Sequence, residues 1–134
     1  MSKYRYWWRP NVERDIRSYP KLKEKKAELQ KVTITPAYEA TIKGSLPSRT
    51  TENTALRQLP PREDQIVRAV ELAIEAISRQ KDGREVLDIV RLVDWKRSHT
   101  IEGASYELHM SVHTAIRRRT RFLLMVAKFE GYLP

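Results

Sequence analysis

The sequence predicts an all-α fold, a helix-turn-helix bundle preceded by a basic helical N-terminal arm. Apolar side chains recur at helical spacing through most of the chain, and no alternating pattern typical of strands competes with them. The segment Ile101–Arg121 divides into two short helical stretches around a turn. A length of 134 residues is enough for one modest core with an additional arm.

The first part, residues 1–35, is a basic arm in which helices are expected. Pro10 suits the first turn of a helix, and Pro20 is expected to break that helix or restart it. Trp7 and Trp8 precede the helix and are expected to pack against it or against a partner.

A linker is expected over residues 36–60. Pro36, Gly44, Pro47 and Pro60 interrupt this stretch, which is rich in Ser and Thr and has little helical periodicity. A linker of this length would let the arm move relative to the rest of the chain.

A helical domain is predicted over residues 61–134. Pro61 suits the first turn of its first helix, and Lys81–Gly83 ends that helix. A second helix is expected from about Arg84 to Trp95. Three aspartates on this helical hairpin are expected to solvate the outer face: Asp82, Asp88 and Asp94. The apolar stripe of the first helix consists of Ile66, Val67, Val70, Ala73, Ile74 and Ile77.

The helix-turn-helix is expected at about residues 100–128. Thr100 and Ser111 suit N-cap positions, and the Ser111 hydroxyl can accept the N–H of Thr114. Gly103 is expected to allow a close helix approach. Three apolar residues stand where the two short crossed helices would share a small core: Leu108, Met110 and Ala115. The last helix would bury Ala115, Phe122, Val126 and Phe129 on one face and stop at Gly131.

Basic charge gathers at the two ends of the chain. Residues 1–35 hold ten Lys or Arg against four Asp or Glu, and residues 96–134 hold seven against three, whereas residues 61–95 hold six against eight. A localised basic patch suits a polyanion, because each neutralised phosphate releases counterions. The chain has no cysteine and no apolar run long enough to span a bilayer, so a soluble protein of the cytoplasm is expected.

The second helix of a helix-turn-helix places its first turns in the major groove of double-stranded DNA. Val112, His113 and Arg117 are the expected readers, with Arg117 suited to guanine and Val112 to a thymine methyl. Ile116 is a further candidate for a contact in the groove or at its rim, and Lys96 is a further candidate for a phosphate contact. The full set of expected DNA contacts is Arg97, Ser98, Ser111, Val112, His113, Thr114, Arg117, Arg118, Arg119 and Arg121. The alternative is that the arginines form a solvated stripe on a packed helix.

Metal binding and catalysis are not expected. His109 and His113 stand four residues apart, but no third ligand lies near them in the sequence and cysteine is absent. No nucleophile motif, acid–base pair or phosphate-binding glycine loop accompanies the carboxylates. We therefore expect no cofactor and no enzymatic activity.

The residues Ala104, Leu108, Met110–Ser111 and Thr114–Ala115 resemble the helix-turn-helix of sigma-factor region 4. The wider frame, residues 61–133 with REVLDIVRLVDW and the ending FEGYL, is similar to phage transcriptional regulators of the RinA and ArpU type. The resemblance implies a phage or prophage activator of late genes that binds near a promoter in a bacterial host and also touches RNA polymerase. The chain lacks a promoter-melting region, so it would not replace a sigma factor.

Two other functions stay open at this point. A small terminase-like component of DNA packaging would also pair a helix-turn-helix with a helical segment, but it would form a ring. An adaptor that binds polymerase without DNA would be insensitive to loss of its basic residues in a DNA-binding assay. Since one helix-turn-helix reads few base pairs, a homodimer or a second DNA contact is expected for useful specificity.

Overall fold

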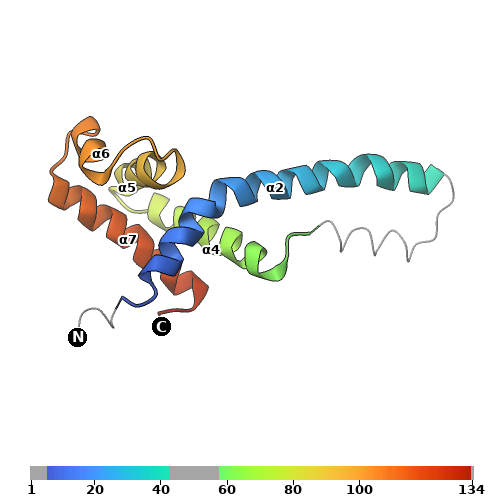
Figure 1. Ribbon diagram of the computed structural model, residues 1–134, viewed down its shortest axis with the longest axis horizontal. Coiled ribbons are helices and arrows are strands. Elements are labelled where there is room, and N and C mark those ends of the chain that lie inside the picture. Colours follow the sequence, from blue (N-terminus) through green and yellow to red (C-terminus); the bar gives the residue numbers. More distant parts are fainter. Residues whose placement is uncertain (1–5, 43–57, 134) are drawn as a thin grey trace. The chain divides into compact units, whose positions relative to one another are not determined.

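The computed structural model describes residues 6–42 and 58–133, with side chains placed for residues 6–30 and 58–133. Every regular element in this part of the chain is a helix (Figure 1), which confirms the predicted all-α class. The elements are α2 (Arg9–Ile42), α4 (Pro61–Ser78), α5 (Gly83–Val90), the π-helix η1 (Arg91–Trp95), α6 (Ile101–Glu107) and α7 (Val112–Glu130). No helix among these residues is long and apolar enough to cross a membrane.

The chain divides into two compact units, one made of Met1–Tyr19 with Gln65–Pro134 and the other of Pro20–Asp64. This differs from the predicted division into an arm over 1–35 and a domain over 61–134. The start of α2 belongs to the first unit because its apolar face is buried there. The buried side chains are Trp8, Val12, Ile16 and Tyr19.

The two neighbouring tryptophans have different surroundings. Trp8 is buried, as expected for a side chain that packs against the helices. Trp7 is 60% exposed, and its ring meets Tyr132 edge to face at 5.5 Å between centroids. The segment before α2 is therefore held to the end of α7 within the first unit.

α2 runs through Pro20 without a break, contrary to the expectation that this proline ends or restarts the helix. Proline lacks the N–H that would bond to the carbonyl four residues earlier, which here is that of Ile16. The indole Nε1 of Trp95 donates to this carbonyl at 2.9 Å. A side chain of η1 thus satisfies the acceptor that proline leaves open, which lowers the cost of proline inside the helix.

The second unit is built on the rest of α2 and the start of α4. α2 continues to Ile42, so residues 36–42, which were expected in the linker, are helical. The predicted linker residues 43–57 lie outside the described part of the chain. Leu22 and Leu59 are buried in this unit.

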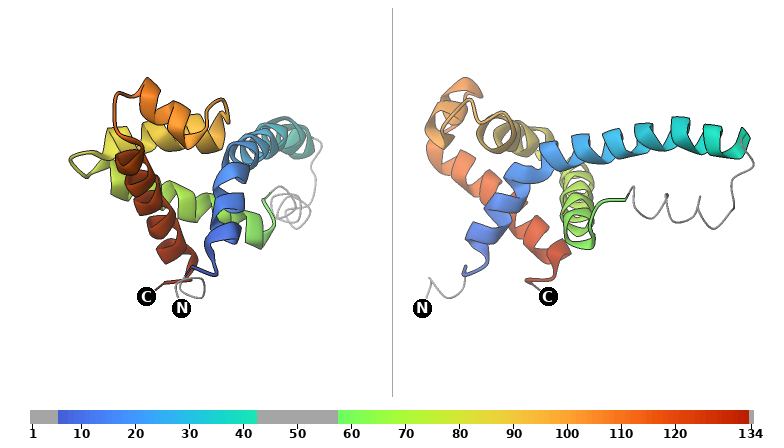
Figure 2. Two further views of the ribbon diagram at one scale, coloured as in Figure 1. Left: turned by 60° about the vertical axis from the view of Figure 1, so that its left-hand side comes forward. Right: turned by 45° about the vertical axis from the view of Figure 1, so that its right-hand side comes forward.

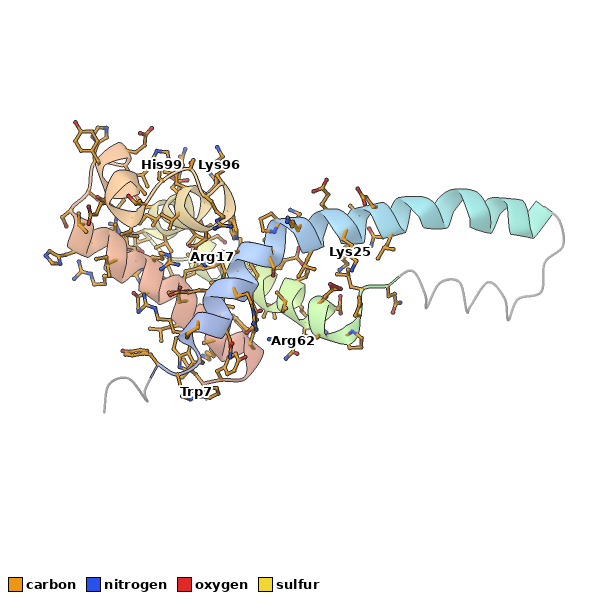
Figure 3. All side chains as sticks on the ribbon, in the orientation of Figure 1. Trp7, Arg17, Lys25, Arg62, Lys96 and His99 are labelled. Atoms are coloured by element: carbon orange, nitrogen blue, oxygen red, sulfur yellow. The ribbon has the colours of Figure 1, made fainter. Side chains whose placement is uncertain are left out.

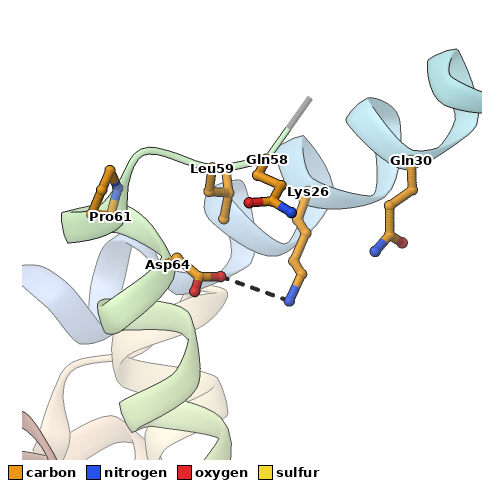
Figure 4. A pocket seen from close by; sticks show the side chains of 6 residues that line it. All are labelled: Lys26, Gln30, Gln58, Leu59, Pro61 and Asp64. Atoms are coloured by element: carbon orange, nitrogen blue, oxygen red, sulfur yellow. Dashed lines mark ion pairs between the residues drawn. The ribbon is translucent and has the colours of Figure 1, made fainter. Parts of the chain in front are cut away.

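Two ion pairs join lysines of α2 to the first turn of α4. Lys25 Nζ lies 3.1 Å from Glu63 Oε2, and Lys26 Nζ lies 3.9 Å from Asp64 Oδ1. An open pocket of about 470 Å³ lies beside the second pair (Figure 4). Its two charged side chains are paired with each other, and its lining residues are Lys26, Gln30, Gln58, Leu59, Pro61 and Asp64.

The core of the first unit is formed by α4, α5 and α7 with the start of α2. The predicted stripe on α4 is confirmed except for Ile74, which is partly exposed. The ring of Trp95 lies 5.6 Å from that of Tyr19 and 6.1 Å from that of Phe122, centroid to centroid. Both views in Figure 2 show α6 next to the beginning of α7, with which it is in contact.

The helix predicted from Arg84 to Trp95 is divided in the structure. α5 ends at Val90 and η1 follows, with the N–H of Lys96 bonded to the carbonyl of Arg91, five residues back, at 2.7 Å. A π-turn contains one residue more per turn than an α-turn. The side chains that follow Val90 are therefore turned away from the directions a continuous α-helix would give them.

Close backbone approach occurs at Gly83 and not at Gly103. A Cβ at Gly83 would lie 2.0 Å from the carbonyl oxygen of Ile77, so a larger residue would force the backbone apart. A Cβ at Gly103 would meet its nearest atom, Thr100 Oγ1, at 3.4 Å, which is ordinary contact within the same segment. The expectation of a close helix approach at Gly103 was wrong.

The end of α7 also differs in one side chain from the prediction. Phe129 is 38% exposed, whereas Leu123 is buried on the core face together with Phe122 and Val126. Gly131 ends the helix with a left-handed φ of 92°, as predicted, because that backbone conformation suits glycine.

Candidate nucleic-acid interface

Two helices joined by a turn lie where the helix-turn-helix is predicted: α6, the turn over 108–111 and α7. Thr100 Oγ1 accepts the N–H of Gly103 at 3.1 Å, and Ser111 Oγ accepts the N–H of Thr114 at 3.1 Å. Both hydroxyls satisfy amides that the first helical turn leaves unbonded. The two helices therefore begin at the residues the sequence indicated.

The turn between the helices depends on a left-handed residue. His109 has a φ of 56°, a conformation that non-glycine residues adopt at some cost. The N–H of Met110 bonds to the carbonyl of Ser105 at 2.9 Å and closes the end of α6. Ala104 and Ala115 are fully buried, which fits the close contact of α6 with α7.

The outward face of α7 carries a mixed polar and apolar surface. His113, Ile116 and Arg117 are exposed, and Val112 and Thr114 are partly exposed. Residues four apart share a helix face, so Val112 lies beside Ile116, and His113 lies beside Arg117. The structure records no ion pair or hydrogen bond for the Arg117 guanidinium among the described residues.

Arg119 does not belong to this face. Its guanidinium forms two hydrogen bonds to Asp94, at 2.7 and 2.9 Å, and lies 4.0 Å from Glu13. Its side chain is only 12% exposed, and that of Asp94 is 1% exposed. Asp94 was expected to solvate an outer face and Arg119 to bind phosphate; both instead form a buried ion pair in the core.

The π-turn explains why Asp94 points inward. Asp94 lies in η1, where the wider turn changes the side-chain directions that helical periodicity predicts. Burial alone would lower the pKa of the Arg119 guanidinium, but the hydrogen bonds and charge of Asp94 outweigh it and raise that pKa. The arginine therefore keeps its charge inside the protein.

Arg118 and Arg121 are held by a common carboxylate. Asp82 Oδ1 lies 2.7 Å from Arg121 Nη1, and Asp82 Oδ2 lies 3.5 Å from Arg118 Nε. The hydrogen bond from Arg121 is the main reason why the pKa of Asp82 lies below its usual value. Gln80 accepts a further bond from Arg121 at 3.1 Å. These arginines stay partly exposed, but Asp82 offsets their charge.

A second basic segment is the turn between η1 and α6. Lys96, Arg97 and Ser98 are exposed there, and Figure 3 labels Lys96 and His99. Arg97 has a φ of 54°. Ser98 Oγ lies 2.7 Å from His99 Nδ1, and His99 Nε2 lies 3.7 Å from Glu107. The contact between His99 and Glu107 therefore connects the turn to α6, while Lys96 and Arg97 remain exposed to solvent.

The remaining titratable side chains can be compared with the geometry of a metal site. The described residues contain no group of three or more His, Cys, Asp or Glu side chains that could hold a metal ion.

Tyr19 donates to Glu71 at 3.3 Å, and burial, with the charge of Glu71, raises the pKa of Tyr19 to about 12. This contact ties α2 to α4 and is not part of the α7 face.

Sequence reasoning missed one exposed side chain next to the α6–α7 turn. Tyr106 is 86% exposed at the end of α6, an unusual position for a tyrosine. Tyr106 lies between Glu102 and Glu107 in the sequence, and this pattern does not tell a tyrosine on the surface from one in the core.

The chain matches no family model, no curated protein and no solved structure.

Proposed function

We propose that this protein is a sequence-specific transcription regulator that binds double-stranded DNA through α7. The observation that carries the proposal is Arg117, which has no partner among the described residues and stands beside His113 on the outward face of a helix-turn-helix. Every other arginine in the cluster 117–121 has a carboxylate partner within 3.5 Å. The Arg117 guanidinium therefore suits the O6 and N7 atoms of a guanine.

The neighbouring side chains supply the rest of the reading surface. Val112 and Ile116 form an apolar ridge suited to thymine methyl groups, and His113 adds a hydrogen-bonding edge. Ser111 caps the helix by accepting the N–H of Thr114, and both would stand where the helix enters the groove. Lys96, Arg97 and Ser98 are placed to contact phosphates, which position the protein without reading sequence.

The finer role follows from the resemblance to phage regulators of the RinA and ArpU type. We infer an activator of late genes that acts with the RNA polymerase of a bacterial host cell. A homodimer would give the two half-sites that a single reading helix lacks.

The experiment is selection of binding sequences from random duplex DNA, followed by affinity measurement on the selected site. Arg117→Ala should weaken binding to that site by about 1–3 kcal/mol and relax preference at one base pair. Arg79→Ala is the matched control, because Arg79 is exposed just after the end of α4 and is paired with Glu75. It should leave affinity unchanged.

Three outcomes would contradict the proposal. An equal loss on selected and random DNA would make Arg117 a phosphate contact and not a reader. Selection that enriches no sequence would favour the polymerase adaptor. A stable ring of about eight to twelve copies in solution would favour a packaging component.

A further inference from the structure

The start of α2 packs against Trp95 of η1, and the basic turn follows this residue directly. The hydrogen bond from Trp95 Nε1 to the Ile16 carbonyl, at 2.9 Å, joins the two elements. The Tyr19 and Trp95 rings lie 5.6 Å apart at the same place. Arg17 and Lys96 are the residues next to the two hydrogen-bonding partners, and Figure 3 labels both.

Arg17 stands on the side of α2 that faces solvent. Val12, Ile16 and Tyr19 point into the core, and the helical period places Arg17 far from their common direction. Its side chain is 46% exposed, and Lys96 and Arg97 are exposed as well. Three exposed cations from two distant parts of the sequence thus follow directly after the two residues that this hydrogen bond joins, Ile16 and Trp95.

The carboxylate that pairs with Arg17 is Glu13, and other cations share it. Glu13 lies 2.8 Å from Arg9, 3.8 Å from Arg17 and 4.0 Å from Arg119, so one carboxylate is shared by three guanidiniums. Both carboxylate oxygens of Asp94 accept hydrogen bonds from Arg119. Glu71 is bonded to Tyr19, which stays neutral up to high pH because its pKa is raised to about 12.

We propose that Arg17 of α2 extends the Lys96–Arg97 surface and binds the DNA backbone beside the site read by α7. This inference rests on the proposed function and adds a phosphate contact from a helix outside the helix-turn-helix. A phosphate diester is the ligand that fits, because the surface offers flexible, exposed cations on long side chains. The contact supplies affinity and orientation, not base recognition.

The test measures affinity for the selected duplex over a range of salt concentrations. Each phosphate contact on duplex DNA contributes about 0.9 to the slope of log affinity against log salt concentration. Arg17→Gln should therefore lower the magnitude of the slope by about 0.9, as should Lys96→Gln. Arg17→Lys keeps the charge and should keep the slope.

Duplex length separates a DNA contact from a structural effect. Trimming base pairs from the flank that Arg17 reaches should lower the wild-type slope by the same amount. On this trimmed duplex Arg17→Gln should cause no further change. Arg68→Gln, which removes an exposed arginine of α4, should leave the slope unchanged on both duplexes.

The outcomes distinguish the two proposals. If Arg17→Gln keeps the wild-type slope on the long duplex while Arg117→Ala still relaxes base preference, this inference fails and the proposed function stands. If the wild-type chain binds no duplex, both fail. A loss of DNA affinity caused by misfolding would appear as a lower thermal unfolding midpoint of Arg17→Gln. This midpoint should match that of the wild type, because Arg17 is half-exposed and lies 3.8 Å from Glu13, so the ion pair contributes little stability.

Discussion

Asp94 and Arg119 show how a buried pair of charged side chains can fix the position of a helix. The pair lies in the core and connects η1 to α7, with Glu13 of α2 nearby. Two hydrogen bonds fix the guanidinium plane, which restricts rotation of α7 about its own axis. The direction of Arg117, two residues earlier on α7, follows from that restriction.

Asp94→Ala should destabilise the protein by about 3–5 kcal/mol, because it leaves the buried Arg119 charge without a partner. Urea unfolding measures the change. Asp88→Ala is the control, since Asp88 pairs with Arg91 at the surface and should cost about 0–1 kcal/mol. The double variant Asp94→Ala with Arg119→Met should recover much of the stability, because the buried charge is then removed together with its partner. Equal effects of Asp94→Ala and Asp88→Ala would contradict the structural role.

Which residues form the site could be predicted only in part from the sequence. The caps at Thr100 and Ser111 follow from local chemistry, and the structure confirms them. The different roles of the arginines could not be predicted, because they depend on carboxylates 25 to 39 residues away in the chain. Charge clustering along α7 therefore overstated the number of free cations.

At the scale of helices and turns, two turns determine how neighbouring helices pack: the turn at Gly83 and the π-turn η1. The turn at Gly83 is the first of them. This glycine starts α5 where its backbone touches the carbonyl of Ile77. Lysine, aspartate and glycine at this place indicate a helix end, but they do not indicate that the glycine is needed for contact.

Gly83→Ala should destabilise the protein by about 1–3 kcal/mol, because the added Cβ would overlap backbone that has no room to relax. Gly103→Ala is the matched control inside α6, where alanine favours the helix and should be neutral or stabilising by up to about 1 kcal/mol. Denaturation midpoints of the two variants should move in opposite directions. A Gly83→Ala protein as stable as wild type would show that the contact relaxes freely.

The existence and order of the helices from Pro61 onward could be predicted because apolar periodicity is strong there. The course of α2 could not. Proline normally interrupts a helix, and nothing local indicates that Trp95, 79 residues after Ile16, would supply the missing donor. The π-turn, which is the second of the two turns, escaped prediction for a similar reason, since a single extra residue barely changes the pattern of apolar positions.

In the molecule as a whole, residues 6–19 belong to the same compact unit as α6 and α7. Trp8, Val12, Ile16 and Tyr19 are all buried in it. Each such side chain contributes about 1.5–3 kcal/mol on burial, so the group together approaches the total stability of a small domain.

A protein truncated to residues 61–134 should therefore fail to fold cooperatively. Thermal unfolding followed by circular dichroism should show a broad or absent transition, and the dye ANS should bind to the exposed core. Val12→Ala in the full chain gives a milder test and should lower stability without abolishing the transition. If the truncated protein unfolds sharply and binds the selected DNA like the full chain, residues 61–134 are an independent domain as the sequence suggested.

The π-turn at η1 also limits how chain length can change. Its one additional residue brings Asp94 to Arg119 and Trp95 to the Ile16 carbonyl at the same time. Because the wider turn absorbs one residue, deleting a residue there would let it close as an α-turn and leave the direction of the following chain unchanged. A residue inserted or deleted within α5 or α7 has no such turn to absorb it and would rotate the following side chains by about 100°. One-residue changes in chain length should therefore be tolerated at η1 and not within these two helices.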